Sequence, residues 1–135
     1  EFNLAQDIPS SKLIFDCGVP LIHIPCMGVT THLHTTIPEL EQHLYGKSDI
    51  GDYLVNIVKE YTENPFAWSK VIWDVSTIAW LVNPEWVYTH LVHSPILTQD
   101  VTWSFDQSRH FIRSAYFMDR DKIFGDLFKK LSSNE

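Results

Sequence analysis

The sequence K-V-I-W-D-V-S-T-I-A-W-L-V-N-P, at Lys70–Pro84, is the segment around which the rest of the chain is organised. Nearly every residue after Asp74 is apolar, so the run predicts a helix that is buried on almost all sides. Pro84 ends this helix, because a proline disfavours helical geometry in the residue before it. Asp74 falls at the helix start, where exposed amide groups and the helix dipole favour a carboxylate.

Asp74 has two interpretations at this point. It is either only the residue that caps the helix, or a carboxylate that a rigid helix end presents to a hard cation. Spacing alone favours the cap. One carboxylate is never a metal site by itself, since calcium takes roughly six to eight oxygen ligands.

Composition restricts the class of protein. A chain of 135 residues with 44% hydrophobic residues is at most one domain, or part of one, with a sizeable core. The net charge of −7 argues against a nucleic-acid partner, which attracts basic surfaces. No apolar run approaches the roughly 20 residues that cross a bilayer, so no membrane partner is expected. Cys17 and Cys26 form no CxxC pair, which fits a reducing cytosol and a cytoplasmic protein.

The first part of the chain predicts a helix followed by a strand, the repeating unit of an α/β domain. Glu1–Gln6 is expected to be extended, and Pro9 suits the first turn of a short helix. Val19–Pro25 is a short apolar run that predicts a buried parallel strand. The apolar side of the short helix is formed by Leu13 and Ile14.

The clearest amphipathic helix follows Ser48, a good N-cap residue, and ends at Asn64-Pro65. A shorter helix is predicted before it, at Pro38–Leu44. Apolar residues recur in the longer helix at i, i+3, i+4, i+7, i+8 and i+11, so we expect this face to pack in the core. The residues of this apolar stripe are Ile50, Tyr53, Leu54, Ile57, Val58 and Tyr61.

The last part of the chain predicts strands and then one helix. Val87–Val92, Val101–Phe105 and Phe111–Met118 are rich in β-branched and aromatic residues and are separated by turn signals. We expect these three segments to form a β meander at the edge of the sheet. Asp119–Leu131 predicts a final helix with an apolar face and with lysines near its C-terminus.

Several motifs together resemble the nucleoside hydrolase family. W-D-V-S-T-I-A-W-L-V-N-P is similar to the family's segment in which an aspartate opens a core helix that ends in a proline, and Glu1-Phe2-Asn3 is similar to its E-F-N motif. The spacing of the two motifs fits, as do I-F-D-C-G-V-P-L-I-H-I-P and the closing D-R-D-K-I-F-G-D-L-F-K-K-L. The segment P-C-M-G-V-T departs from the family's P-L-D-V-T.

The resemblance covers essentially all 135 residues but only the C-terminal portion of a single nucleoside hydrolase domain. It implies an α/β fold: part of an open, mostly parallel sheet with flanking helices and the C-terminal β meander. The family's N-terminal aspartate cluster, which supplies most calcium ligands and the general base, has no counterpart here. The chain alone is therefore expected to be inactive and to bind calcium weakly. Its expected partners are a small-molecule nucleoside and either further copies of the chain or the missing N-terminal half.

The resemblance also implies calcium-dependent hydrolysis of the N-glycosidic bond of ribonucleosides. Asp74 matches the family's C-terminal calcium ligand, and Glu1 and Asn3 match contacts to the ribose hydroxyls. Trp73 stands where many members carry a histidine that protonates the base. An indole cannot act as a general acid near neutral pH, but it can stack on the leaving base and stabilise its developing positive charge, which favours purines.

Two alternatives stay open. Trp73 is either this base-stacking residue or a core residue packed with Phe66 and Trp80. The protein is either a nucleoside N-ribohydrolase or a non-catalytic nucleoside-binding or structural module that retains the fold. An intact upstream aspartate cluster would favour the enzyme.

Overall fold

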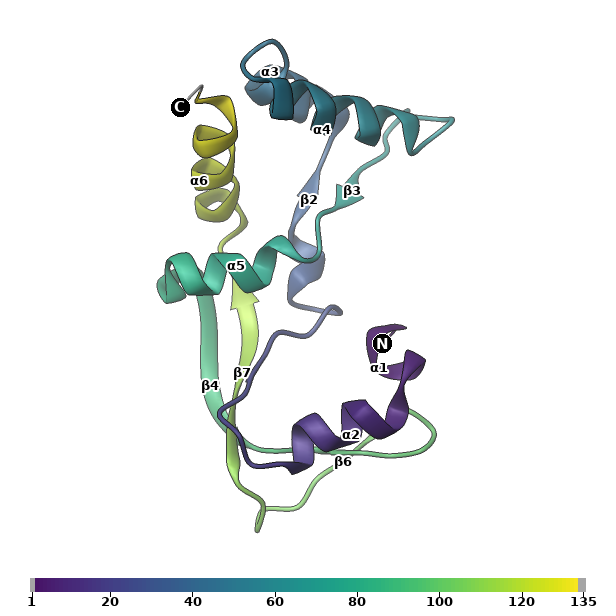
Figure 1. Cartoon of the computed structure of the whole chain (residues 1–135), viewed down its shortest axis with the longest axis vertical. Coiled ribbons are helices and arrows are strands. Elements are labelled where there is room, and N and C mark those ends of the chain that lie inside the picture. The colour runs from purple at the N-terminus through teal and green to yellow at the C-terminus, as the bar shows by residue number, and fades with distance from the viewer. Residues whose placement is uncertain (1, 134–135) are drawn as a thin grey trace.

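A computed structural model describes residues 2–133. Its helices are α1 (Phe2–Gln6), α2 (Ile8–Asp16), α3 (Ile37–Leu44), α4 (Asp49–Glu60), α5 (Val75–Val82) and α6 (Arg120–Ser132), with 3-10 turns η1 (Thr30–His32) and η2 (Pro84–Trp86). Its strands are β1 (Ile22–His23), β2 (His34–Thr35), β3 (Lys70–Val71), β4 (Val87–His93), β5 (Ile96–Leu97), β6 (Trp103–Ser104) and β7 (Phe111–Met118). In Figure 1, α1 and α2 lie at one end, α3, α4 and α6 lie at the other, and β4 and β7 run between them. No helix in the described range is both long and apolar enough to span a bilayer.

The sheets are small and partly antiparallel. Three strands form one sheet in the order β1-β7-β4, in which β1 is parallel and β4 antiparallel to β7. The pairs β2-β3 and β5-β6 are antiparallel. The mixed α/β class is confirmed, whereas the mostly parallel sheet is not, because β1-β7 is the only parallel pair within residues 2–133.

The predicted β meander is wrong in its connections. β4 pairs directly with β7, from Val87 opposite Met118 to His93 opposite Phe111, and the short β5-β6 hairpin lies between them in the sequence. Alternating apolar residues identify strands but not their partners. The pairing with β7 places Val87 opposite Met118, and both side chains are buried in the main hydrophobic cluster, which favours this pairing.

Four helices begin at side-chain caps. The carboxylates of Asp7 and Asp119 and the hydroxyls of Thr36 and Ser48 each accept a hydrogen bond from an amide in the first turn of α2, α6, α3 and α4 respectively. These starts match the predicted helices. The extended entry expected at Glu1–Gln6 is wrong for its described part, because Phe2–Gln6 is the short helix α1.

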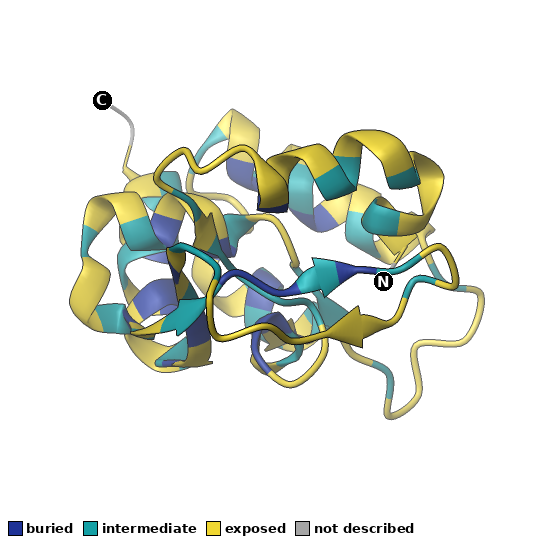
Figure 2. Ribbon diagram, turned by 90° about the horizontal axis from the view of Figure 1, so that it is seen from below, coloured by how far each residue is buried: buried dark blue, intermediate teal, exposed yellow. Residues whose placement is uncertain are grey.

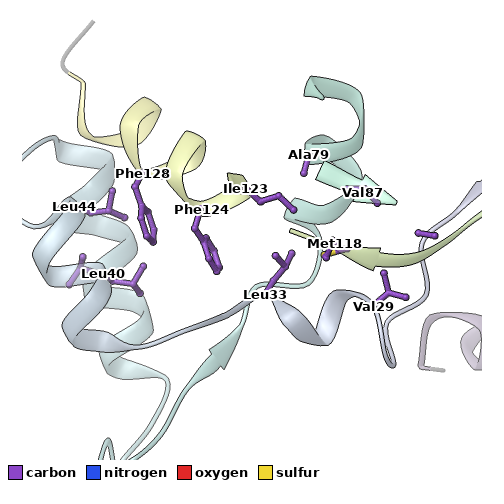
Figure 3. Close-up of a cluster of buried hydrophobic side chains, with 12 residues drawn as sticks. Val29, Leu33, Leu40, Leu44, Ala79, Val87, Met118, Ile123, Phe124 and Phe128 are labelled. Carbon is purple, nitrogen blue, oxygen red and sulfur yellow. The ribbon is translucent and has the colours of Figure 1, made fainter. Parts of the chain in front are cut away.

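The hydrophobic core lies where α6 packs against α3 and α4 and against the ends of β4 and β7. Figure 3 shows Phe124 and Phe128 of α6 facing Leu40 and Leu44 of α3. The two phenylalanine rings stack with centroids 5.3 Å apart. Full burial of such a side chain contributes roughly 1.5–3 kcal/mol, so this cluster anchors the fold. The apolar face predicted for the last helix is confirmed at Ile123, Phe124 and Phe128.

Most of the apolar stripe of α4 is not core, contrary to the prediction. Of its residues, Leu54 and Val58 are partly buried, and Val58 packs against the core. Ile50, Tyr53, Ile57 and Tyr61 are exposed, and α4 buries Gly51 and Val55 instead. The reason is close packing on α3: a Cβ added at Gly51 would come within 2.8 Å of the Leu44 carbonyl oxygen. Gly51 therefore faces α3, and most of the stripe is exposed to solvent. Figure 2 shows how much of the helical surface of the molecule is exposed.

Two further expectations of burial are wrong for a related reason. Helix α5 is covered on one side only, burying Ser76 and Ala79, while Leu81 on its outer side is 71% exposed. Helix α2 buries Phe15, and the predicted apolar side at Leu13 and Ile14 is exposed. These faces are largely exposed to solvent, with Leu13 at 63% and Ile14 at 47% exposure.

A half-buried ion pair ties α3 to α6. Arg120 Nη2 donates to Glu39 Oε1 at 2.6 Å, and Arg120 Nε donates to the His34 carbonyl at 2.9 Å. The Thr35 hydroxyl donates to Glu39 Oε2 at 2.8 Å. Burial alone would raise the pKa of Glu39, but the hydrogen bonds from Arg120 and Thr35 outweigh it and lower that pKa. The carboxylate of Glu39 is thus held ionised.

Candidate functional site

One pocket brings together three of the four residues predicted for the site. Asn3, Trp73 and Asp74 line a cavity of about 400 Å³. The remaining described lining residues are Phe2, Cys26 and Met27. The fourth predicted residue, Glu1, lies outside the described residues.

Helix α1 carries Asn3 into the pocket because it is held on α2. The Ser11 hydroxyl donates to the Leu4 carbonyl at 3.2 Å, which joins the two helices. Helix α2 is fixed in turn to the strand region, where the Ser94 hydroxyl and Arg109 Nη2 both donate to the Phe15 carbonyl, at 2.6 and 2.7 Å. The position of Asn3 therefore depends on contacts with residues distant in sequence.

The second wall follows strand β1. β1 runs parallel to β7, with His23 opposite Ser114, and the chain then turns through Cys26 and Met27. Gly28 has a φ of 80°, a conformation that glycine adopts without strain, and its amide donates to the Thr31 hydroxyl at 3.1 Å. This turn presents Met27 to the pocket.

Strand β3 and the start of α5 supply the third wall. β3 pairs with β2, and the Ile72 amide donates to the Leu33 carbonyl at 3.0 Å, directly before Trp73. Leu33 is fully buried, so this hydrogen bond fixes the approach to the helix. Trp73 and Asp74 thus lie in a short turn whose two ends are held by β3 and α5.

The Asp74 carboxylate does not cap α5. Asp74 occupies the N-cap position, but its side chain makes no capping hydrogen bond. Its backbone carbonyl instead accepts hydrogen bonds from the Thr77 hydroxyl at 2.9 Å and the Thr77 amide at 3.3 Å. The residue is exposed, so the carboxylate can contact a bound molecule. The interpretation of Asp74 as only a side-chain cap is wrong.

Trp73 is 36% exposed and lines the same pocket. The expected alternative was a core shared with Phe66 and Trp80. Phe66 is 87% exposed, and Trp80 packs against the main hydrophobic cluster instead. The observed positions do not form that shared core. They leave part of the indole surface of Trp73 accessible in the pocket.

The lining residues supply few ligands for a cation. Asp74 provides the only carboxylate among the described lining residues, and Asn3 provides an amide oxygen. No group of three or more His, Cys, Asp or Glu residues able to hold a metal occurs within residues 2–133. Oxygen donors of this kind suit a hard cation such as calcium, but two residues are far short of the roughly six to eight oxygens it takes. The described residues alone therefore form at most part of a calcium site.

Sequence reasoning missed Phe2, Cys26 and Met27 as lining residues. Cys26 and Met27 lie in the segment P-C-M-G-V-T, whose departure from the family pattern was visible in the sequence, although its position in the fold was not. Phe2 lies between the two motif residues Glu1 and Asn3, so its place in the motif could have identified it as a lining residue. The three side chains make the pocket more apolar than the predicted residues alone.

Comparison with known proteins identifies the fold. Among solved structures the chain is similar to a plant nucleoside hydrolase, the PpNRh1 enzyme, with a TM-score of 0.83 and 18% sequence identity. The match covers 98% of this chain and 48% of the chain of that enzyme. No family model and no curated protein matches the sequence. The predicted resemblance is confirmed for the fold: the chain has the nucleoside hydrolase fold and spans about half the length of the structure it matches.

Proposed function

We propose that this chain supplies the nucleoside-binding side of a calcium-dependent nucleoside N-ribohydrolase. Such an enzyme uses water to cleave the N-glycosidic bond of a ribonucleoside, giving ribose and the free base. The observation that carries the proposal is the convergence of Asn3, Trp73 and Asp74 in one pocket, although they come from α1 and from the start of α5. The fold of a nucleoside hydrolase over the same chain supports it.

Asp74 and Asn3 have distinct roles in this proposal. The exposed Asp74 carboxylate would provide one calcium ligand, and the Asn3 amide, with Glu1, would hold ribose hydroxyls. Calcium, when bound, would fix the ribose diol and activate water. Hydrogen bonds to the ribose use binding energy from parts of the substrate that do not react to orient the carbon that does.

Trp73 would act on the leaving base. A partly exposed indole offers an aromatic face on which a base can stack, and the attraction increases as the base gains positive charge. Phe2 and Met27 add apolar surface to the same pocket. A purine presents a larger face than a pyrimidine, so we propose a preference for purine nucleosides.

The general base and the remaining calcium ligands must come from the half of the fold outside these 135 residues. We therefore propose that the chain alone does not hydrolyse nucleosides and binds calcium weakly. We also propose a cytoplasmic location and assembly either with further copies or with that other half. The alternative function is a non-catalytic nucleoside-binding or structural module that retains the fold, and loss of the upstream aspartate cluster would favour it.

The test is Asp74→Ala in a protein that carries the whole fold. We expect kcat/KM for inosine to fall more than about 100-fold, with loss of bound calcium, because a charged ligand is removed. Measured without calcium, the melting temperature should stay nearly unchanged, since the Asp74 side chain makes no capping hydrogen bond. Asp49→Ala is the matched control, because Asp49 is an exposed aspartate in the first turn of α4 outside this pocket.

Normal turnover and calcium content in Asp74→Ala would contradict the proposed role of this carboxylate. A protein with the whole fold that binds inosine without hydrolysing it would favour the non-catalytic module. Hydrolysis of inosine by the purified 135-residue chain would show that the missing half is not needed.

A further inference from the structure

A second pocket lies on one face of the three-stranded sheet, and it shares no lining residue with the first. Its volume is about 480 Å³. Ile112 and Ser114 of β7 stand two residues apart and so project from the same face. Val92 of β4 is paired with Ile112, and His23 of β1 is paired with Ser114, so all three strands contribute to the floor. The site is therefore built on regular structure.

The segment that includes and follows β6 adds aromatic and acidic groups to the pocket. Trp103 and Phe105 line it, followed by Asp106 and Gln107. The Trp103 ring is held by edge contacts to Phe15, with centroids 5.0 Å apart. Phe105 is exposed and has no aromatic contact among the described residues. An ordered indole and an exposed phenyl ring thus stand beside a carboxylate.

The Asp106 carboxylate is held in place through only one of its two oxygens. Both the amide and the hydroxyl of Ser108 donate to its Oδ1, at 2.8 and 2.7 Å. No described residue donates a hydrogen bond to Oδ2. The hydrogen bonds from Ser108 lower the pKa of Asp106, so the group is anionic at neutral pH.

The nearby arginine is engaged elsewhere. Arg109 Nε donates to the Ser94 carbonyl at 2.8 Å, and its Nη2 pairs with Asp16 at 2.6 Å. No ion pair joins Arg109 to Asp106 among the described side chains. The positive charge of Arg109 attracts the Asp106 carboxylate and helps to lower its pKa, but no ion pair with Arg109 blocks the approach of a ligand.

His93 is also fixed at the pocket. Its Nδ1 lies 2.7 Å from the Arg109 carbonyl, which can only accept, so Nδ1 carries the proton in this contact. The imidazole stacks on Phe111 with centroids 4.3 Å apart. This contact leaves Nε2 as the ring nitrogen available to a ligand, and in the neutral ring it is an acceptor.

We propose that this pocket binds a small organic cation, namely a protonated amine attached to an aromatic or aliphatic body. The aromatic rings of Trp103 and Phe105 would contact the body and attract the positive charge. The free oxygen of Asp106 would accept a charge-assisted hydrogen bond, and Nε2 of His93 would face the ligand as a second polar contact. The net charge of −7 adds long-range attraction for cations. The site does not depend on the proposed hydrolase function.

The first experiment compares three probes of similar shape on the purified 135-residue chain. Tryptamine is cationic at neutral pH, 3-ethylindole is neutral, and indole-3-propionate is anionic. Titration followed by NMR should show tryptamine shifting the Trp103 indole N–H signal and binding about tenfold more tightly than 3-ethylindole, with indole-3-propionate weakest. Absence of tryptamine binding, or equal affinity for all three probes, would overturn the proposal.

The second experiment uses Asp106→Asn, which removes the charge and keeps an oxygen that can accept from Ser108. Tryptamine affinity should fall about tenfold, while affinity for 3-ethylindole stays the same. Asp100→Asn is the matched control, because Asp100 is an exposed aspartate in the turn before β6 that does not line the pocket. Equal tryptamine affinity in Asp106→Asn and wild type, with a native amide spectrum, would refute the role of the carboxylate.

Discussion

The side chains around Phe124 are packed together and buried, whereas those around Trp73 are exposed to solvent in a pocket. Phe124 is 2% exposed and belongs to a cluster that joins α3, α4, α5, α6 and the β4-β7 pair. The pocket of Trp73 is lined instead by residues such as Phe2, which is 77% exposed. The difference separates two tasks: one region stabilises the fold, and the other holds surface that is free to bind a ligand.

This contrast also explains which substitutions each region tolerates. Truncation of a buried ring leaves a cavity and loses its packing contacts, while truncation of an exposed ring loses little that water does not replace. Substitutions at the two ends should therefore differ in kind, with losses of stability at one end and losses of binding or turnover at the other.

Phe124→Ala should give the largest change in the free energy of unfolding. A small change would contradict the contrast between the buried and the exposed region. We expect the free energy of unfolding to fall by about 3–5 kcal/mol, because the ring is buried and stacks on Phe128. Urea unfolding followed by circular dichroism measures the change. Phe2→Ala is the control at the open end and should change stability by less than about 0.5 kcal/mol. Equal losses in the two variants would mean that both regions carry the fold.

Trp73→Ala sharpens the functional side of the comparison. In a protein with the whole fold, it should reduce kcat/KM for inosine by roughly 5- to 150-fold, which corresponds to the roughly 1–3 kcal/mol of base–aromatic stacking. The loss should be smaller for nitrophenyl riboside, whose leaving group needs little activation. Trp68→Ala is the control, since Trp68 is half-buried and does not line the pocket. Equal losses on both substrates together with a lower melting temperature would assign Trp73 to packing.

Glu39→Gln gives the smallest expected change and tests the ion pair between α3 and α6. At pH 7 it should lower the free energy of unfolding by about 1–2 kcal/mol, because charge-assisted hydrogen bonds from Arg120 are lost. The lowered pKa of Glu39 means that its contribution is present above the pKa of the unfolded chain and disappears as the pH falls through the folded value.

The difference in the free energy of unfolding between wild type and Glu39→Gln should therefore be constant near neutral pH. It should begin to decrease below about pH 5 and disappear as the pH falls further. Denaturant titrations at a series of pH values measure it. A difference that does not change with pH would show that Glu39 stabilises the fold through packing and not through its charge.

Local signals predicted local structure well. The cap at Ser48 and the apolar face of Asp119–Leu131 depend on neighbouring residues, and the structure has them as expected. The convergence of Asn3, Trp73 and Asp74 was predicted from the motif resemblance and not from spacing, because no periodicity relates α1 to α5.

Burial was predicted poorly because it depends on what a face meets. The stripe that includes Tyr53 and Ile57 has helical spacing, but spacing identifies a face without identifying its neighbour. The same holds for Leu81 on α5, whose apolar surroundings in the sequence suggested a core helix. The predicted strand partners were wrong for the same reason, since the pairing of β4 with β7 depends on the fold of the whole chain.

The parallel pairing of β1 with β7 has a consequence for the order in which the molecule is assembled on the ribosome. Ile22 pairs with Arg113, so the contact closes a loop on the order of 90 residues, and such closure carries an entropic cost. The Phe15 carbonyl likewise accepts hydrogen bonds from Ser94 and Arg109, which are synthesised much later than Phe15. Helices α1 and α2 are therefore synthesised before the segments that anchor them. The residues on the Asn3 side of the pocket reach their places only after β4 and β7 have been translated.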